Sequence, residues 1–196
     1  MGVPVTEYLP AAPDADDLGR YGQEKDSLES AGKQNTPEYA VALTNWAACL
    51  GALGDEEAAL RAYSAALIAH EAAGSTDTPS YADTVVNVGD HLNELGRHRE
   101  AMELFAKARE IYQSLSWENT LNNAVVLHNM GLCAFKQGKP QEAMGFYREA
   151  QGAYESILLG AEAPQYAELL RDMEEAEDAE LRPLELGCGN AMGVER

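Results

Sequence analysis

The sequence has little positive charge. Its 14 Lys and Arg residues stand against 33 Asp and Glu residues, which gives a formal net charge of −19. Nucleic acids and anionic membrane surfaces are bound by clustered Lys and Arg. The composition therefore argues against both of these as partners and favours a neutral or basic protein segment, which such a field attracts.

Cysteine and long apolar runs are also scarce. Cys49, Cys133 and Cys188 do not have the spacing of a metal site or of a disulfide pair, and this usage is typical of a reducing compartment. The longest apolar run, residues 40–53, is too short to span a bilayer. Residues 1–10 lack the charged start and apolar centre of a secretory signal. These features predict a cytoplasmic protein without a membrane span.

The first residues leave two alternatives open. Gly2, directly after Met1, and Thr6 fit a loose N-myristoylation pattern. Acidic rather than basic residues follow, and one acyl chain anchors a protein only marginally. Residues 1–13 are accordingly either acylated at Gly2 or a plain flexible segment.

A repeat of 42 residues organises most of the chain. Gly54, Gly96 and Gly138 mark its turns. The same step relates Ala59, Ala101 and Ala143; Ala66, Ala108 and Ala150; the rings Tyr63, Phe105 and Tyr147; and Asn45, Asn87 and Asn129. Each unit reads as helix, tight turn, helix, a piece that cannot bury its apolar face alone and must stack on its neighbours. The pattern predicts an all-α fold, an α-solenoid of stacked antiparallel helix pairs.

The packing residues of this unit resemble those of the tetratricopeptide repeat, in the 42-residue variant found in kinesin light chains. Within residues 82–122 they are Val85, Val88, Gly89, Leu92, Gly96, Ala101, Phe105 and Ala108. The resemblance covers about residues 14–182 and implies a right-handed superhelix. Small residues in the first helices (Ala47, Gly89, Gly131) would let helices approach closely, and the ring of each second helix would fill the wedge between them. The family is defined by packing and has many partners, so the resemblance implies a binding scaffold without naming what it binds.

The repeat sets the expected boundaries. Helices are expected at about 37–53 and 55–73, 79–95 and 97–114, and 120–137 and 139–158, with an earlier helix from about 14 to 32. The expected units are a half-repeat (14–36), three repeats (37–78, 79–120, 121–163), a capping helix (164–182) and a flexible Gly-rich tail (183–196). Thr-Pro pairs suit helix starts because Thr can cap and Pro tolerates the first turn. Glu174 and Glu177 place charge where a further helix would dock, which predicts that the stack ends there.

In a tetratricopeptide stack the first helix of each unit lines a concave groove. Helical spacing places three sets of residues on this face: Val41, Thr44, Asn45, Ala48 and Ala52; Asp83, Val86, Asn87, Asp90, Asn93 and Glu94; and Val125, His128, Asn129, Leu132, Phe135 and Lys136. This face is the candidate peptide-binding site.

The asparagines carry most of this hypothesis. An amide side chain both donates and accepts, so a row of them can bind the backbone of an extended peptide, and the resemblance implies the same role. The alternative is that each asparagine bonds to a neighbouring helix and keeps the repeat spacing. Asp83, Asp90 and Glu94 would favour Lys or Arg on the ligand or be solvated surface.

Two further residues of this face shape its expected chemistry. Leu132 and Phe135 form an apolar patch. Some chaperone-binding members of the family clamp a terminal carboxylate with several basic residues. Lys136 is the only Lys or Arg among the residues expected on this face, so the carboxylate-clamping function is not carried over.

No catalytic set, metal site or cofactor site is predicted. The four histidines lack ligand-like spacing, and His128, the one expected in the groove, is interpreted as a polar lining residue rather than a proton donor. Residues 184–190 look like the first glycine motif of methyltransferases that use S-adenosylmethionine, but seven residues after Gly189 cannot form the sheet that such a loop needs. The sequence therefore predicts a non-enzymatic interaction scaffold or adaptor. The alternatives are a regulatory domain of a larger enzyme that continues past residue 196, and self-association through the ends of the stack.

Overall fold

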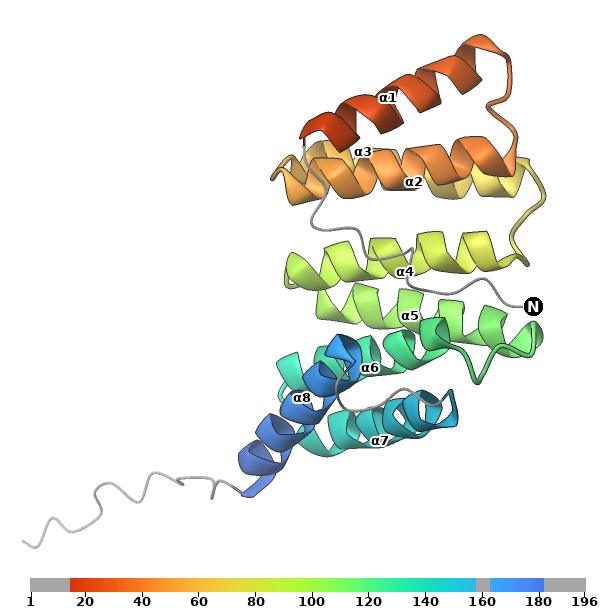
Figure 1. The fold of residues 1–196 in the computed structure, drawn as a ribbon. Helices are drawn as coiled ribbons and strands as arrows, with labels where there is room; N and C mark the ends of the chain where they lie inside the picture. The colour runs from red at the N-terminus through yellow and green to blue at the C-terminus, as the bar shows by residue number, and fades with distance from the viewer. Residues whose placement is uncertain (1–14, 158–162, 182–196) are drawn as a thin grey trace, which may run out of the picture.

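The computed structural model describes residues 15–157 and 163–181, and within these ranges it contains eight α-helices and no β-strand. The helices are α1 (Ala15–Ser30), α2 (Pro37–Ala52), α3 (Glu56–Ala72), α4 (Pro79–Glu94), α5 (His98–Ser114), α6 (Leu121–Lys136), α7 (Pro140–Ser156) and α8 (Pro164–Leu181). The helix pairs stack in chain order (Figure 1), and the helices α2, α4, α6 and α8 also contact one another in succession. The predicted α-solenoid of helix pairs is confirmed, and each expected helix bound is met within two residues.

Each first helix of a full repeat begins in the same way. Thr36, Thr78 and Thr120 have extended backbones, and each hydroxyl accepts a hydrogen bond from the backbone N–H three residues later, at 3.4, 3.3 and 3.3 Å. Pro37 and Pro79 follow in the first turn, where the missing N–H costs nothing. The sequence signal for helix starts is therefore confirmed by the capping geometry.

The turns use the left-handed backbone conformation. Gly54, Gly96 and Gly138 have φ values of 85°, 74° and 75° between the two helices of each repeat. The corresponding position between repeats is occupied by Gly74 (φ 63°) and, 42 residues later, by Ser116 (φ 58°). A residue with a Cβ is disfavoured in this conformation, so Ser116 stores strain that the glycines avoid.

Close approach of the paired helices depends on small residues. A Cβ built on Gly89 would lie 2.7 Å from a ring atom of Phe105, and one built on Gly131 would lie 2.2 Å from the ring of Tyr147. Both rings are fully buried. The expectation that the ring of the second helix fills a space left by a small residue of the first helix is confirmed.

A buried polar network links the first two full repeats. Thr44 Oγ1 lies 2.9 Å from the carbonyl oxygen of Ala40 and 3.0 Å from Thr84 Oγ1, which is 3.1 Å from His70 Nε2. Burial lowers the pKa of His70. Thr44 is only 4% exposed, so its predicted place on the groove face is wrong: it lies on the edge of α2 that contacts α4.

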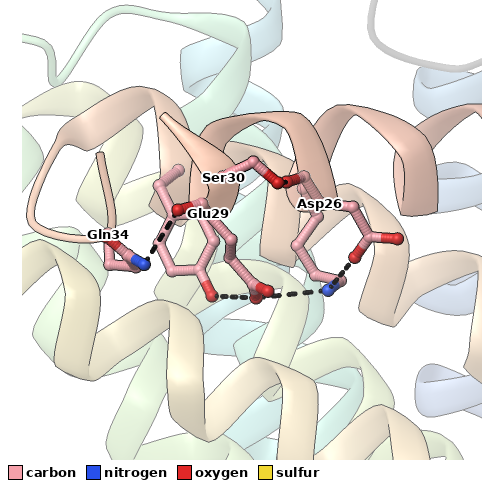
Figure 2. Close-up of polar contacts among 6 residues, drawn as sticks. Asp26, Glu29, Ser30 and Gln34 are labelled. Atoms are coloured by element: carbon pink, nitrogen blue, oxygen red, sulfur yellow. Dashed lines mark hydrogen bonds and ion pairs between the residues drawn. The ribbon is translucent and has the colours of Figure 1, made fainter. Parts of the chain in front are cut away.

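The half-repeat helix α1 docks on α2 through mixed contacts. The Tyr39 hydroxyl donates to Glu29 Oε1 at 2.7 Å, and Lys25 donates to the same oxygen at 3.2 Å. Figure 2 shows how Ser30 and Gln34 close the end of α1 by donating to the carbonyl oxygens of Asp26 and Glu29. The hydrogen bonds from Tyr39 and Lys25 lower the pKa of Glu29, and burial raises the pKa of Tyr39 to about 12.

The last helix of the stack, α8, is mostly polar. It buries Leu169 and Ala176 against its neighbours, while Glu174 and Glu177 are exposed. None of the described helices combines the length and apolar character that crossing a membrane demands.

Candidate functional site

The first helices α2, α4 and α6 lie next to one another and carry the predicted site residues. Seven of these are partly buried: Asn45, Asp83, Asn87, Asp90, Asn129, Leu132 and Phe135. Glu94 and Lys136 are exposed, and His128 is buried. The predicted residues therefore do not form one uniform surface.

His128 lies under α8. It is 5% exposed, its Nε2 is 2.7 Å from Asp172 Oδ2, and its ring meets the edge of the Tyr147 ring. The structure differs here from the expectation that His128 lines an open groove. The physical reason is that α8 packs on α6 as a further first helix would, and covers this part of the face.

Polar contacts between α4 and α6 occupy several of the candidate residues. Asn129 Nδ2 donates to Asp90 Oδ1 at 2.5 Å. Two turns before Asp90 in α4, Asp83 Oδ1 accepts from the Tyr112 hydroxyl at 2.6 Å and from Asn122 Nδ2 at 2.8 Å. Asn129 thus bonds to a neighbouring helix, as the alternative stated for the asparagines predicted. Asp83, for which the alternative was solvated surface, instead joins α4 to α5 and α6.

Both aspartates of α4 have a raised pKa. Burial raises the pKa of Asp83, although the bonds from Tyr112 and Asn122 oppose the shift. Burial, together with the negative charge of Glu94, raises the pKa of Asp90 to about 7. Asp90 therefore takes up a proton more readily than an ordinary surface aspartate does.

The contact between α2 and α4 is different. Ala48 occupies the position of α2 that corresponds to Asp90 of α4, so Asn87 has no acidic neighbour of the kind that Asn129 has. The Asn87 side chain makes no hydrogen bond within the described part of the chain, and it is only half buried. Of the two amides, Asn87 is the one that remains available to a ligand.

A pocket of about 310 Å³ opens beside Asn87. Its walls come from three helices: Ala48, Gly51 and Ala52 of α2, Tyr63 of α3, and Asn87, Asp90, His91 and Glu94 of α4. We call it the α2–α4 pocket. Three of the predicted site residues, Asn87, Asp90 and Glu94, meet in it.

Sequence reasoning did not assign Tyr63 and His91 to this site. A Cβ on Gly51 would lie 2.9 Å from the His91 ring, so the glycine leaves room for the imidazole. His91 Nε2 is 3.1 Å from Glu56 Oε2 but outside hydrogen-bond geometry. The available signal was a break in the repeat: Gly51 stands where the next unit has Asn93.

The described residues offer no group of three or more His, Cys, Asp or Glu side chains that could hold a metal ion. The glycine motif at residues 184–190 and the acylation pattern at Gly2 lie outside the described residues. The chemistry of the α2–α4 pocket is that of a small acidic recess with hydrogen-bonding side chains.

Stacked helix pairs with shared apolar seams define an α-solenoid repeat protein. A family model described as tetratricopeptide repeat matches residues 38–114 and 84–156, which together make up more than half of the chain. The chain belongs to the tetratricopeptide repeat family, with repeats like those of kinesin light chains. Members of this family are typically non-catalytic scaffolds for protein interactions.

Solved structures show the same fold. The chain is similar to BtubC (BKLC) from P. vanneervenii, with a TM-score of 0.71, 14% identity, and coverage of 86% of this chain and 68% of that one. It is also similar to a single-residue variant of a Podosopora anserina protein described as a kinesin light chain with nearly identical repeats (TM-score 0.69, 15% identity, 83% and 76% covered). Among curated proteins, none matches this chain.

Proposed function

We propose that this protein is a non-enzymatic adaptor that binds an extended segment of a partner protein across its first helices, centred on the contact between α2 and α4. The observation that carries the proposal is the half-buried amide of Asn87 in the α2–α4 pocket, which makes no hydrogen bond to any residue that the structure describes. Such an amide can donate to and accept from one peptide group of a ligand, which holds the ligand backbone without selecting its sequence.

Neighbouring residues extend this surface in both directions. Asn45 of α2 is half buried and has no side-chain hydrogen bond within the described residues. On α6, Leu132 and Phe135 are partly buried apolar side chains and Lys136 is exposed. The net charge of −19 disfavours an acidic ligand. Together these features support a neutral or basic segment that meets amides first and an apolar patch beyond them.

The proposal is tested by screening a random dodecapeptide library against the immobilised protein and measuring the selected peptides by fluorescence anisotropy. We expect Asn87→Ala to weaken binding by about tenfold, because a buried polar contact is lost. Asn35→Ala is the matched control, since Asn35 is an exposed amide in the loop before α2. Far-ultraviolet circular dichroism and thermal melting should be the same for all three proteins.

Two results would contradict the proposal. One is a library screen that enriches no peptide at all. The other is a set of selected peptides whose affinities change equally for the Asn87 and Asn35 variants, which would place their site away from the first helices.

A further inference from the structure

The α2–α4 pocket contains a second polar group without a partner, on a different helix from its acids. Tyr63 of α3 is only 4% exposed and lines the pocket. Its hydroxyl has no hydrogen bond within the described residues. Burial and the nearby charges of Asp90 and Glu94 raise the pKa of Tyr63. Since Tyr63 lines the pocket, this hydroxyl can donate to or accept from a group that enters there.

The acids that face the pocket are only partly satisfied. Asp90 Oδ1 accepts from Asn129, whereas Oδ2 has no hydrogen bond within the described part of the chain. Glu94, one turn further along α4, is exposed at the rim. His91, the one basic group lining the pocket, faces carboxylates of Glu56 and Glu94 at 3.1 and 3.9 Å. Negative charge therefore prevails at this site.

The opposite wall is small and apolar. Ala48 and Ala52 of α2 stand where α4 has Asp90 and Glu94, and Gly51 between them carries no side chain. The recess is thus acidic on one side and lined by methyl groups on the other. Lys and Arg have this combination, an alkyl stem that packs on apolar surface and a charged head that donates several hydrogen bonds.

Other ligand chemistries fit the pocket less well. An anion would be repelled by Asp90 and Glu94. An apolar side chain would leave the Tyr63 hydroxyl and Asp90 Oδ2 buried without partners, which is unfavourable. A cationic head would meet three acceptors at once: the carboxylate of Asp90, the hydroxyl oxygen of Tyr63 and the amide oxygen of Asn87.

The corresponding place one repeat later is already filled. Between α4 and α6 the acid is Asp90 itself, on the preceding first helix, and Asn129 Nδ2 donates to its Oδ1 at 2.5 Å. Leu132 stands where α4 has Asp90. In the described residues the α4–α6 contact therefore uses Oδ1 of Asp90 within the fold, whereas Oδ2 of the same carboxylate has no hydrogen bond.

We propose that the α2–α4 pocket receives a Lys or Arg side chain of the bound partner segment, with Asp90 and the Tyr63 hydroxyl as its principal contacts. This inference rests on the proposed function, since it assigns one anchor of the segment bound by the first helices.

The test uses the peptides selected in the library screen. Each Lys is replaced in turn by norleucine, which keeps the alkyl stem without the ammonium group, and each Arg by citrulline, which keeps the length of the side chain without its charge. One position should lose about tenfold or more in affinity, the effect of losing charge-assisted hydrogen bonds. For the Asp90→Asn protein the same replacement should cost little, because the two changes remove one interaction.

Two further variants complete the design. Tyr63→Phe removes only the hydroxyl, and it should weaken the binding of the basic peptide more than the binding of its neutral counterpart. Glu103→Gln removes an exposed carboxylate from α5, outside the pocket, and should leave the Lys or Arg requirement unchanged. The Glu103 variant thus separates a local contact from attraction by the net charge.

The outcomes separate this inference from the proposed function. Peptides that depend on Asn87 but need no Lys or Arg, or whose basic residue is equally important to the Asp90→Asn protein, would overturn the anchor and leave the adaptor function standing. Failure to select any peptide would overturn both.

Discussion

Replacing Asp90 by Asn should stabilise the folded protein, and more so at high pH. The pKa of Asp90 is raised from 3.8 to about 7, so the folded state binds a proton that the unfolded chain releases between these values. Stability contributed by this group therefore falls as pH rises from about 4 to 7. At 1.36 kcal/mol per pKa unit, the raised pKa lowers the free energy of unfolding, relative to an aspartate of ordinary pKa, by roughly 4 kcal/mol at about pH 8 and by roughly 1 kcal/mol at about pH 4.5.

The asparagine side chain avoids that cost and keeps an oxygen that can accept from Asn129. Urea unfolding of both proteins at the two pH values gives the gain directly. Other titrating groups, including His70, are present in both proteins and cancel in the difference. Glu103→Gln is the control for the loss of one negative charge, and it should have the same small effect at both pH values.

An equal gain for Asp90→Asn at both pH values would refute the reasoning, because it would show that ionisation of Asp90 carries no special cost in the fold. A loss of stability at about pH 8 would refute it more strongly. In that case the carboxylate would be a net stabilising partner of Asn129, and the pKa of Asp90 would lie below rather than above its ordinary value.

Three further predictions concern helix packing, a strained turn and a buried histidine. Gly131→Ala should destabilise the fold by about 1–3 kcal/mol in urea unfolding, since its Cβ would meet the Tyr147 ring. Gly145 in α7 has open space around it, so Gly145→Ala should stabilise the fold by up to about 1 kcal/mol. If both substitutions changed stability in the same direction, the close approach of Gly131 to the Tyr147 ring would be contradicted. Ser116→Gly should gain up to about 1 kcal/mol by relieving its positive φ, whereas a loss would show that the serine is unstrained. Burial lowers the pKa of His70 below 6.5, so stability is lost as pH falls below that value; an NMR titration that finds 6.5 or higher would contradict this.

The sequence was sufficient for the fold because its signals are local and recur. A threonine cap, a turn glycine or a small residue facing a ring acts within one helix pair. The 42-residue step repeats each of them at equivalent positions, for example at Gly89 and Gly131. Three copies of one hairpin leave little freedom for any arrangement but stacking.

The site was less predictable because its contacts join different repeats. Asn87 and Asn129 are equivalent in the sequence pattern, yet within the part of the chain that the structure describes the side chain of Asn129 is hydrogen-bonded and that of Asn87 is not. Their difference comes from the residue on the preceding first helix, Asp90 in one case and Ala48 in the other. Helical periodicity indicated the face on which His128 lies but not that α8 would cover it, since coverage depends on how a later helix packs.

The positions where the repeat departs from itself are therefore the informative ones for function. Packing residues recur because every hairpin needs them, whereas Asp90 has Ala48 and Leu132 as its counterparts, and Glu94 has Ala52 and Lys136. The raised pKa of Asp90 predicts that its ionised form weakens the fold, and an isosteric asparagine keeps an oxygen that can accept from Asn129. Stability reasons alone do not account for a carboxylate at this position, but a ligand cation does, because it would favour ionisation of Asp90 and recover on binding the free energy that burial of the charge costs. The same substitution is thus expected to strengthen the fold and weaken binding, which is the pattern of a residue retained for its ligand.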